Sequence, residues 1–486
     1  MLDEKFLSRM QGLLGDNYTA FRDALYSGDA VRGVRINTLK TDIDAFLKAK
    51  AFNLNAIPYA DDGFIPEDAD GIGNTPEHHA GMIYVQDPGA MATLNAMDLK
   101  PGWRVLDMCA APGGKSGQAA AKIGDGGFLL SNEFVPKRAK TVVSNFERLG
   151  VKNAIVTSLN TAELPKLFSK YFDLVIADVP CSGEGMFRKS ETAVSEWSEE
   201  NVEACASRQR RIMKNAAPLV RHGGYLLYST CTYSLEENEM VIDAFLKENR
   251  DFSLVKVKDA LVEATSDGIV FSDTAEPTLT LARRFYPHVS RGEGQFIALM
   301  KRESGESSSQ TILYKDSSAP PTKEEIRAID KFFNDNLTCI PDGKIIKVGE
   351  NLVISTHGVP IPPRSVFSAG VLIGKVEKGL LFPSHHFFSA FGRLFKRQEK
   401  LTRGDARTEK YLFGEEIEAK SFSDGGWCSV IYEGAVLGGG KASAGRIKNH
   451  YPKGLRIKKQ FFSRKGRTEN KNGRKNTGYC WRYRHN

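Results

Sequence analysis

One segment constrains the fold of this chain more than any other: VLDMCAAPGGKSGQAA, residues 105–120. It begins as a short apolar strand over Val105–Met108, passes through a glycine turn and predicts a helix that begins near Lys115. Gly113 and Gly114 can adopt positive φ and carry no Cβ, so a ligand can approach the backbone closely. A strand, a glycine turn and a helix N-terminus in this order are typical of nucleotide sites in doubly wound α/β sheets.

The letters GGKS suggest a phosphate-binding P-loop, which requires the pattern G-x-x-x-x-G-K-[ST]. The first glycine of that pattern would stand at the position of Cys109, so a P-loop is excluded. A second apolar run, GFLLSNE, places Glu133 nineteen residues after Gly114. Nucleoside-binding sheets carry a carboxylate for the ribose hydroxyls about 20 residues after the turn. The segment therefore predicts a site for a nucleoside-containing cofactor.

The 486 residues are enough for several domains, each with its own core. No apolar run of 18 residues and no signal-peptide core are found, so we expect a cytoplasmic protein without a membrane span. We also expect the protein to be a monomer. The seven cysteines are scattered and form no C-x-x-C pair, and His78 and His79 have no partners at metal spacing. This pattern predicts reduced thiols, with neither a disulfide framework nor a metal site.

Positive charge is concentrated at the C-terminal end. Residues 446–486 contain fourteen lysines and arginines against one acid, a net charge of +13, whereas the rest of the chain carries −5. A concentrated basic segment with interleaved aromatic residues indicates a polyanionic partner such as RNA. A solvated tail without a partner is the alternative.

Short apolar strands alternate with longer amphipathic helices between residues 93 and 302, which is typical of a parallel α/β sheet. The expected strands are WRVLDM, GFLLSNE, NAIVTS, FDLVIAD, GGYLLYST and GQFIALM. Ligands bind outside the carboxyl ends of such strands. We therefore expect one site to be formed by the residues that follow them, at Asp107–Lys115, Glu133, Asn160, Asp178–Cys181 and Ser229–Cys231.

Composition divides the chain into five parts. We expect an accessory domain over residues 1–92, the α/β domain over 93–302 and a Ser/Pro-rich linker over 303–325. A mixed intermediate domain over 326–415 precedes strands with glycine turns, typical of a small barrel, over 416–486.

Two cysteines directly follow predicted strands, at the strand ends where the site is expected. They are Cys181 in DVPCSGEGMFRK and Cys231 in YSTCTYSLEENE. One such cysteine alone is more often structural than catalytic. Two of them beside a cofactor site favour catalysis, because a thiolate is a strong nucleophile at neutral pH.

Taken together, DMCAAPGGKS, DVPCSGEG and YSTCTYSLEENE resemble the motifs of the RNA (cytosine-5)-methyltransferases, which use S-adenosylmethionine. The resemblance extends through RINTLK, GMIYVQDPGAM and RRFYPHVSRGEGQFIALM. The C-terminal third is similar to the bacterial RsmF type of this family, up to about Gln460. The resemblance implies a Rossmann-like methyltransferase core between an N-terminal accessory domain and a C-terminal PUA-like RNA-binding domain.

The resemblance also implies roles for single residues. Cys231 would add to carbon 6 of a cytosine, Cys181 would help to remove the carbon 5 proton, and Asp178 would hydrogen-bond the base. Lys115 could also face the base and lower the pKa of a thiol. The cofactor would be held by Cys109, Ala110, Ala111, Pro112, Gly113, Gly114, Lys115, Glu133, Asn160 and Asp178.

Two positions depart from the family pattern. Asn160 stands where an aspartate contacts the adenine, although its amide oxygen can still accept a hydrogen bond, and Gly89 stands where a serine is usual. The expected substrate is 16S ribosomal RNA or a small-subunit particle, with the target base unstacked. A transfer-RNA cytosine-5 methyltransferase and a non-catalytic ribosome-assembly factor are the alternatives.

Overall fold

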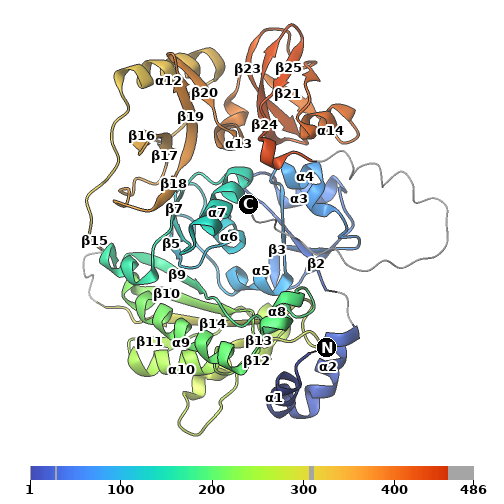
Figure 1. Ribbon diagram of the computed structural model, residues 1–486, viewed down its shortest axis with the longest axis vertical. Helices are drawn as coiled ribbons and strands as arrows, with labels where there is room; N and C mark the ends of the chain where they lie inside the picture. The colour runs from blue at the N-terminus through green and yellow to red at the C-terminus, as the bar shows by residue number, and fades with distance from the viewer. Residues whose placement is uncertain (1, 28–29, 306–310, 458–486) are drawn as a thin grey trace, which may run out of the picture.

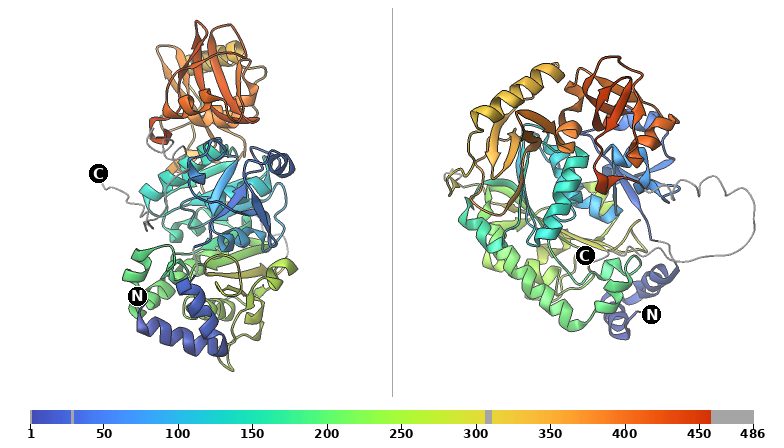
Figure 2. Two further views of the ribbon diagram at one scale, coloured as in Figure 1. Left: turned by 90° about the vertical axis from the view of Figure 1, so that its right-hand side faces the viewer. Right: turned by 45° about the horizontal axis from the view of Figure 1, so that its top comes forward.

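The central element of the protein is a long mixed sheet with helices on both faces (Figure 1). The computed structural model describes residues 2–27, 30–305 and 311–457, so most of the basic tail expected over 446–486 lies outside the described residues. The β-rich C-terminal part stands at one end of the molecule and the first two helices at the other (Figure 2). No helix within the described ranges is both long and apolar enough to cross a membrane.

The N-terminal part combines a helical pair with a small antiparallel sheet of order β2-β3-β1-β4. The amphipathic pattern EKFLSRMQGLL forms a helix that is capped by the Asp3 side chain, which accepts a hydrogen bond from the backbone of Lys5. The elements are α1 (Glu4–Leu14), α2 (Tyr18–Ser27), β1 (Gly33–Ile36), α3 (Ile43–Lys48), β2 (Leu54–Ile57), β3 (Ala60–Pro66), α4 (Pro76–His79) and β4 (Ile83–Gln86).

The central sheet has the strand order β12-β13-β14-β10-β9-β5-β6-β7-β18, and β11 pairs with β14. Its middle five strands are parallel and match five of the expected strands. They are β5 (Arg104–Asp107), β6 (Phe128–Asn132), β7 (Ala154–Thr157), β9 (Phe172–Asp178) and β10 (Val220–Thr230). The helices that connect or cover them include α5 (Pro88–Asn95), α6 (Gly114–Ile123), α7 (Pro136–Leu149), α9 (Glu199–Ala216) and α10 (Glu239–Glu248).

The expected parallel α/β sheet is extended at both ends by antiparallel strands. The strand GQFIALM forms β14 (Gln295–Arg302), which runs antiparallel to β10. An antiparallel strand added to a parallel sheet is a common arrangement, and strand direction leaves no mark on hydrophobic periodicity. The other antiparallel additions are β11 (Phe252–Leu254), β12 (Ser266–Asp267), β13 (Arg283–Phe285) and β18 (Val366–Ala369).

Two hydrophobic clusters cover the two faces of this sheet. Leu106, Val175 and Leu226 belong to one cluster, whereas their strand neighbours Val105, Leu174 and Leu227 belong to the other. Successive side chains of a strand point to opposite faces, so strands covered on both faces are apolar throughout. This is why the sequence shows continuous apolar runs here rather than alternation.

The C-terminal part contains two further sheets, of order β16-β17-β19-β20 and β21-β23-β24-β25-β22. The expected linker over 303–325 includes β15 (Thr311–Ile312), which pairs with β8 (Phe168–Ser169), and the start of α12 (Lys323–Asn336). The remaining elements are α8 (Glu191–Glu196), α11 (Asp259–Glu263), β16 (Lys344–Val348), β17 (Asn351–Ser355), β19 (Val371–Glu377), β20 (Leu380–Pro383), α13 (His385–Phe391), β21 (Gln398–Leu401), α14 (Ala406–Phe413), β22 (Ile417–Glu418), β23 (Gly426–Tyr432), β24 (Ala435–Ser443) and β25 (Arg446–Asn449).

The expected domain boundaries stay predictions, but two of them separate strands that pair in the same sheet. Strand β18 belongs to the expected intermediate domain and yet extends the central sheet beside β7. Strand β21 precedes the expected boundary at residue 416 and yet pairs with β23. Backbone hydrogen bonds across a sheet edge are independent of sequence distance, so composition cannot reveal them.

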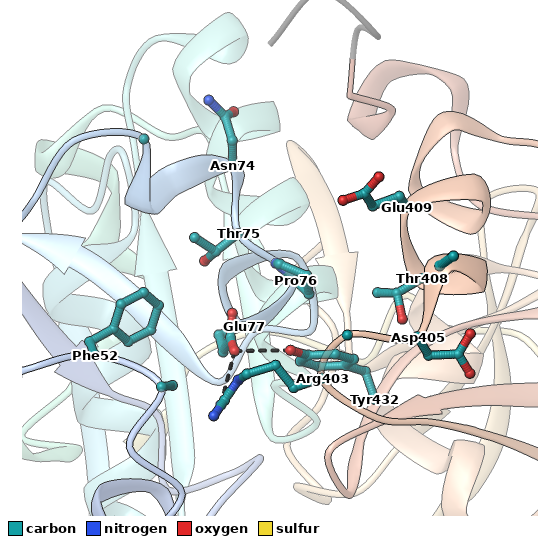
Figure 3. Close-up of a pocket in the computed structure, with 14 residues that line it drawn as sticks. Phe52, Asn74, Thr75, Pro76, Glu77, Arg403, Asp405, Thr408, Glu409 and Tyr432 are labelled. Atoms are coloured by element: carbon teal, nitrogen blue, oxygen red, sulfur yellow. Dashed lines mark hydrogen bonds and ion pairs between the residues drawn. The ribbon is translucent and has the colours of Figure 1, made fainter. Parts of the chain in front are cut away.

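Direct contacts tie the C-terminal sheets to the N-terminal part. The Glu77 carboxylate is buried and accepts hydrogen bonds from the Tyr432 hydroxyl at 3.0 Å and the Arg403 guanidinium at 3.3 Å (Figure 3). These three residues lie in a cavity of about 490 Å³ between the two parts. Nearby, His79 Nδ1 lies 2.7 Å from the Tyr451 hydroxyl, so this histidine is a packing residue.

Candidate active site

A pocket of about 690 Å³ lies at the carboxyl ends of the parallel strands, within the size range of cofactor sites. The five strand ends that the sequence places on one rim do meet here. The expected site residues that line the pocket are Cys109, Ala111, Glu133, Asn160, Asp178, Cys181 and Cys231.

The glycine turn joins β5 to α6, and the residues just before it, Cys109 and Ala111, line the pocket. Gly113 caps α6 with a φ of 105°, but Gly114 is already helical, so only one of the two glycines has the expected positive φ. A Cβ on Gly114 would lie 3.0 Å from the Tyr84 ring, and one on Gly113 would lie 3.5 Å from Val142. Gly114 therefore leaves room for the Tyr84 ring, whereas Gly113 is required by its positive φ, because a Cβ there would make only an ordinary van der Waals contact.

The Glu133 carboxylate is held just beyond β6 and is almost fully buried. It accepts a hydrogen bond from the backbone of Val135 at 3.0 Å and a long one from Ala111 at 3.4 Å, and Arg138 lies 3.4 Å away. These contacts place a carboxylate with spare lone pairs on the pocket wall. Ribose hydroxyls are suitable donors to it.

Asn160 lies beyond β7 and caps a short helical turn. Its Oδ1 atom accepts a hydrogen bond from the backbone of Ala162 at 3.0 Å, while its own backbone N–H donates to Glu163 at 3.1 Å. The amide oxygen keeps a second lone pair, so an adenine amino group can still donate to it. The capping box fixes the direction of this side chain.

Asp178, at the end of β9, forms an ion pair with Lys115, with 2.8 Å between Nζ and Oδ2. The Ser229 hydroxyl donates to its other oxygen at 2.7 Å. Burial by itself would lower the pKa of Lys115, but Asp178, and to a smaller extent Cys231, raise it above its ordinary value. Lys115 is therefore a charged group beside the thiols, and its charge is balanced mainly by Asp178.

Cys181 and Cys231 are in direct contact, with 3.2 Å between their sulfur atoms. They follow the adjacent parallel strands β9 and β10, where Asp178 pairs with Ser229. The interaction with Cys231, followed by burial, raises the pKa of Cys181 well above its ordinary range. Cys181 is therefore a thiol at neutral pH and can donate a hydrogen bond to Cys231.

Comparison with known proteins agrees with this arrangement. Three family models match: "16S rRNA methyltransferase RsmB/F" over residues 94–301, "N-terminal domain of 16S rRNA methyltransferase RsmF" over 2–88 and "Methyltransferase RsmF PUA domain" over 398–457. Ribosomal RNA small subunit methyltransferase F of Vibrio vulnificus is 30% identical over 482 residues, 95% of this chain and 99% of the relative. The chain belongs to the ribosomal RNA small subunit methyltransferase F family.

A second relative of the same name, from Psychromonas ingrahamii, is 29% identical and covers 93% of the chain and 97% of its own length. A solved methyltransferase homologue from Pyrococcus horikoshii is 29% identical over 62% of this chain and 95% of that one, with a TM-score of 0.54. The methyltransferase F family consists of S-adenosylmethionine-dependent enzymes, so the predicted enzyme class, cofactor and Rossmann-like fold are confirmed.

The polar groups around the pocket of this chain suit S-adenosylmethionine. The buried Glu133 carboxylate and the Asn160 amide oxygen border one pocket, and these groups can accept hydrogen bonds from ribose hydroxyls and from an adenine amino group. Of the segment Cys109–Lys115, only Cys109 and Ala111 are among the pocket-lining residues. Burial, together with the charges of Asp107 and Asp178, raises the pKa of Cys109 well above its ordinary range, so Cys109 is an uncharged wall residue.

Sequence reasoning missed two buried carboxylates that hold the cysteine loops. Glu237 accepts hydrogen bonds from the backbone and hydroxyl of Ser182, and from Gln209 at 2.8 Å. Glu184 accepts from Trp197 at 2.9 Å, from the Thr232 hydroxyl at 2.9 Å and from the backbone of Tyr233 at 3.0 Å. Both acids stand inside the quoted motifs, PCSGEG and SLEENE, which was the only available signal.

Proposed function

We propose that this protein transfers a methyl group from S-adenosylmethionine to carbon 5 of a cytosine in 16S ribosomal RNA. The family models and the named relatives support the RNA class. The observation that carries the chemistry is the pair of touching thiols, Cys181 and Cys231, beside the Asp178–Lys115 ion pair.

Carbon 5 of cytosine is too weak a nucleophile to accept a methyl group without activation. A thiolate that adds to carbon 6 turns the ring into an enamine-like nucleophile. Cys231 suits this step, because Cys181 stays protonated and can donate its S–H to the Cys231 sulfur. We therefore assign the covalent bond to Cys231.

Cys181 acts in the second half of the reaction. S-adenosylmethionine, when bound, supplies the methyl group that carbon 5 accepts. Once Cys231 is bonded to carbon 6, the largest cause of the raised pKa of Cys181 is removed, so Cys181 can release its own proton to solvent and then take the proton from carbon 5. The bond between carbon 6 and sulfur then breaks and Cys231 leaves as a thiolate. A thiol with a raised pKa gives a more basic thiolate, which suits proton removal.

Asp178 and Lys115 hold the base. As an ion-paired carboxylate, Asp178 can accept a hydrogen bond from the cytosine amino group, while the Lys115 ammonium can donate to a ring acceptor. Glu133, Asn160 and the pocket-lining Cys109 and Ala111 hold the cofactor. The target cytosine must leave its stack to reach these groups. Action in the cytoplasm, and as a monomer, are further predictions of this proposal.

The proposal is tested by bisulfite sequencing of total RNA with and without the protein, which identifies both the RNA and the position. We expect a cytosine in 16S ribosomal RNA that is protected from bisulfite conversion when the protein is present and loses this protection without it. Protection lost in transfer RNA instead would support the alternative substrate. No change in any RNA would support a non-catalytic assembly factor.

A covalent adduct tests the roles of the two cysteines. Cys181→Ala should accumulate a protein–RNA adduct that survives denaturing electrophoresis, because elimination stalls once the proton acceptor is removed. Cys231→Ala and the double variant should give none, and Cys339→Ala, which changes an exposed cysteine outside the site, should behave as the wild type. An adduct in Cys231→Ala alone would mean that the roles are exchanged.

A further inference from the structure

Helix α9 forms one wall of the pocket and presents a basic face to it. Arg208, Arg211 and Asn215 follow each other at helical spacing, and all three line the pocket. Arg210 and Lys214 are exposed on the same helix but do not belong to the pocket lining. The helix therefore offers two positive charges to the site and two others elsewhere.

The two pocket arginines have no acidic partner among the described residues, and both are exposed. The pocket carboxylates already have basic partners, because Asp178 pairs with Lys115 and Glu133 lies beside Arg138. Arg208 and Arg211 are thus surplus positive charge. A guanidinium stays charged and offers five N–H donors in a plane, which suits a phosphate group.

The position of α9 indicates which anion these arginines meet. Gln209, between them, donates to the backbone oxygen of Pro180 at 3.0 Å, so this part of the helix lies against the Cys181 loop. Asn215, further along, donates to Thr161 at 3.1 Å, beside the expected adenine contact. Arg208 and Arg211 therefore border the thiol end of the pocket, where the proposed mechanism requires the target base.

We propose that Arg208 and Arg211 bind the RNA phosphates that flank the target cytidine. A nucleotide extruded into the pocket brings its own two phosphates to the pocket mouth, and phosphate contacts position a substrate without reading its sequence. The two arginines are positioning residues for the base. This inference rests on the proposed function, since it takes an extruded nucleotide as the substrate.

The test compares R208Q/R211Q with R210Q/K214Q, which removes the same charge from the same helix outside the pocket. Each phosphate contact to a single strand contributes about 0.7 to the slope of log affinity against log salt. R208Q/R211Q should therefore reduce the slope for a 16S ribosomal RNA transcript by about 1.4. It should also raise the KM for RNA about tenfold near 0.15 M salt. R210Q/K214Q should change both quantities less.

The affinity for S-adenosylmethionine shows whether the two arginines bind RNA phosphates or the carboxylate of the cofactor. It should be unchanged in R208Q/R211Q, and R208K/R211K should keep the salt slope because it keeps the charge. A wild-type salt slope in R208Q/R211Q, or an effect no larger than that of R210Q/K214Q, would overturn the inference. So would weakened cofactor binding with unchanged RNA binding, which would place the cofactor carboxylate there. Failure of the proposed function is seen separately, as a wild-type protein that methylates no cytosine.

Discussion

Glu237 gives the protein a specific pH dependence that one substitution should remove. Its side chain is fully buried, and burial raises its pKa from the usual 4.5 to about 7, against the opposing hydrogen bonds from Ser182 and Gln209. The folded state therefore holds the proton more tightly than the unfolded state. The resulting stabilisation is fully present below pH 4.5 and is lost as the pH rises through 7.

The size of the effect follows from the two pKa values. Each unit of difference corresponds to about 1.4 kcal/mol, so Glu237 alone should lower the free energy of unfolding by about 2 to 3 kcal/mol between pH 5 and pH 8. Glu237→Gln keeps the shape but cannot ionise. Relative to the wild type, this variant should therefore gain stability by that amount over the same interval.

Thermal unfolding at pH 5 and pH 8 measures this difference. If the methyltransferase region unfolds as one unit, the Tm of Glu237→Gln relative to the wild type should rise by about 5 °C from pH 5 to pH 8. Glu236→Gln is a suitable control, because the pKa of Glu236 is lowered and not raised, despite its partial burial, by Ser234 and Arg9. An equal Tm difference between variant and wild type at both pH values would refute the reasoning.

Three other predictions follow from the same structure. Cys231→Ala should abolish methyl transfer but keep S-adenosylmethionine binding, as isothermal titration can show; retained turnover would identify the wrong thiol. Glu77→Ala should lower stability by about 2 kcal/mol in thermal unfolding, because it leaves Arg403 and Tyr432 without their buried acceptor, whereas Glu409→Ala in the same cavity should not. Deleting residues 458–486, which carry ten lysines and arginines, should flatten the salt dependence of RNA binding; an unchanged slope would make the segment a spectator. The deletion starts after Ile457 because β25 belongs to the C-terminal sheet and Tyr451 to a buried hydrophobic cluster.

Local patterns were enough to predict the elements that depend on near neighbours. The amphipathic helix KRAKTVVSNFERLG, one of those expected between residues 93 and 302, is such a case, and it ends at Gly150 with positive φ. The meeting of Glu133, Asp178 and Cys231 was also predictable, because the carboxyl ends of parallel strands share one rim. Motif spacing thus determined the position of the candidate site.

Other features depend on contacts between residues far apart in the chain. The antiparallel direction of β14, the addition of β18 beside β7 and the pairing of β21 with β23 are decided by which sheet edges and apolar faces meet. The 3.2 Å contact of the two thiols and the surplus charge of Arg208 and Arg211 follow from the same packing.

The sequence by itself determined the elements, the rim and the residue types that can do the chemistry. Only the tertiary structure decided which charges are already paired, that the pKa of Cys181 is raised by Cys231 and burial, and which pocket arginines have no acidic partner among the described residues. The physical reason is that pKa values and ion pairs depend on distance and burial, and neither of these is a function of sequence separation.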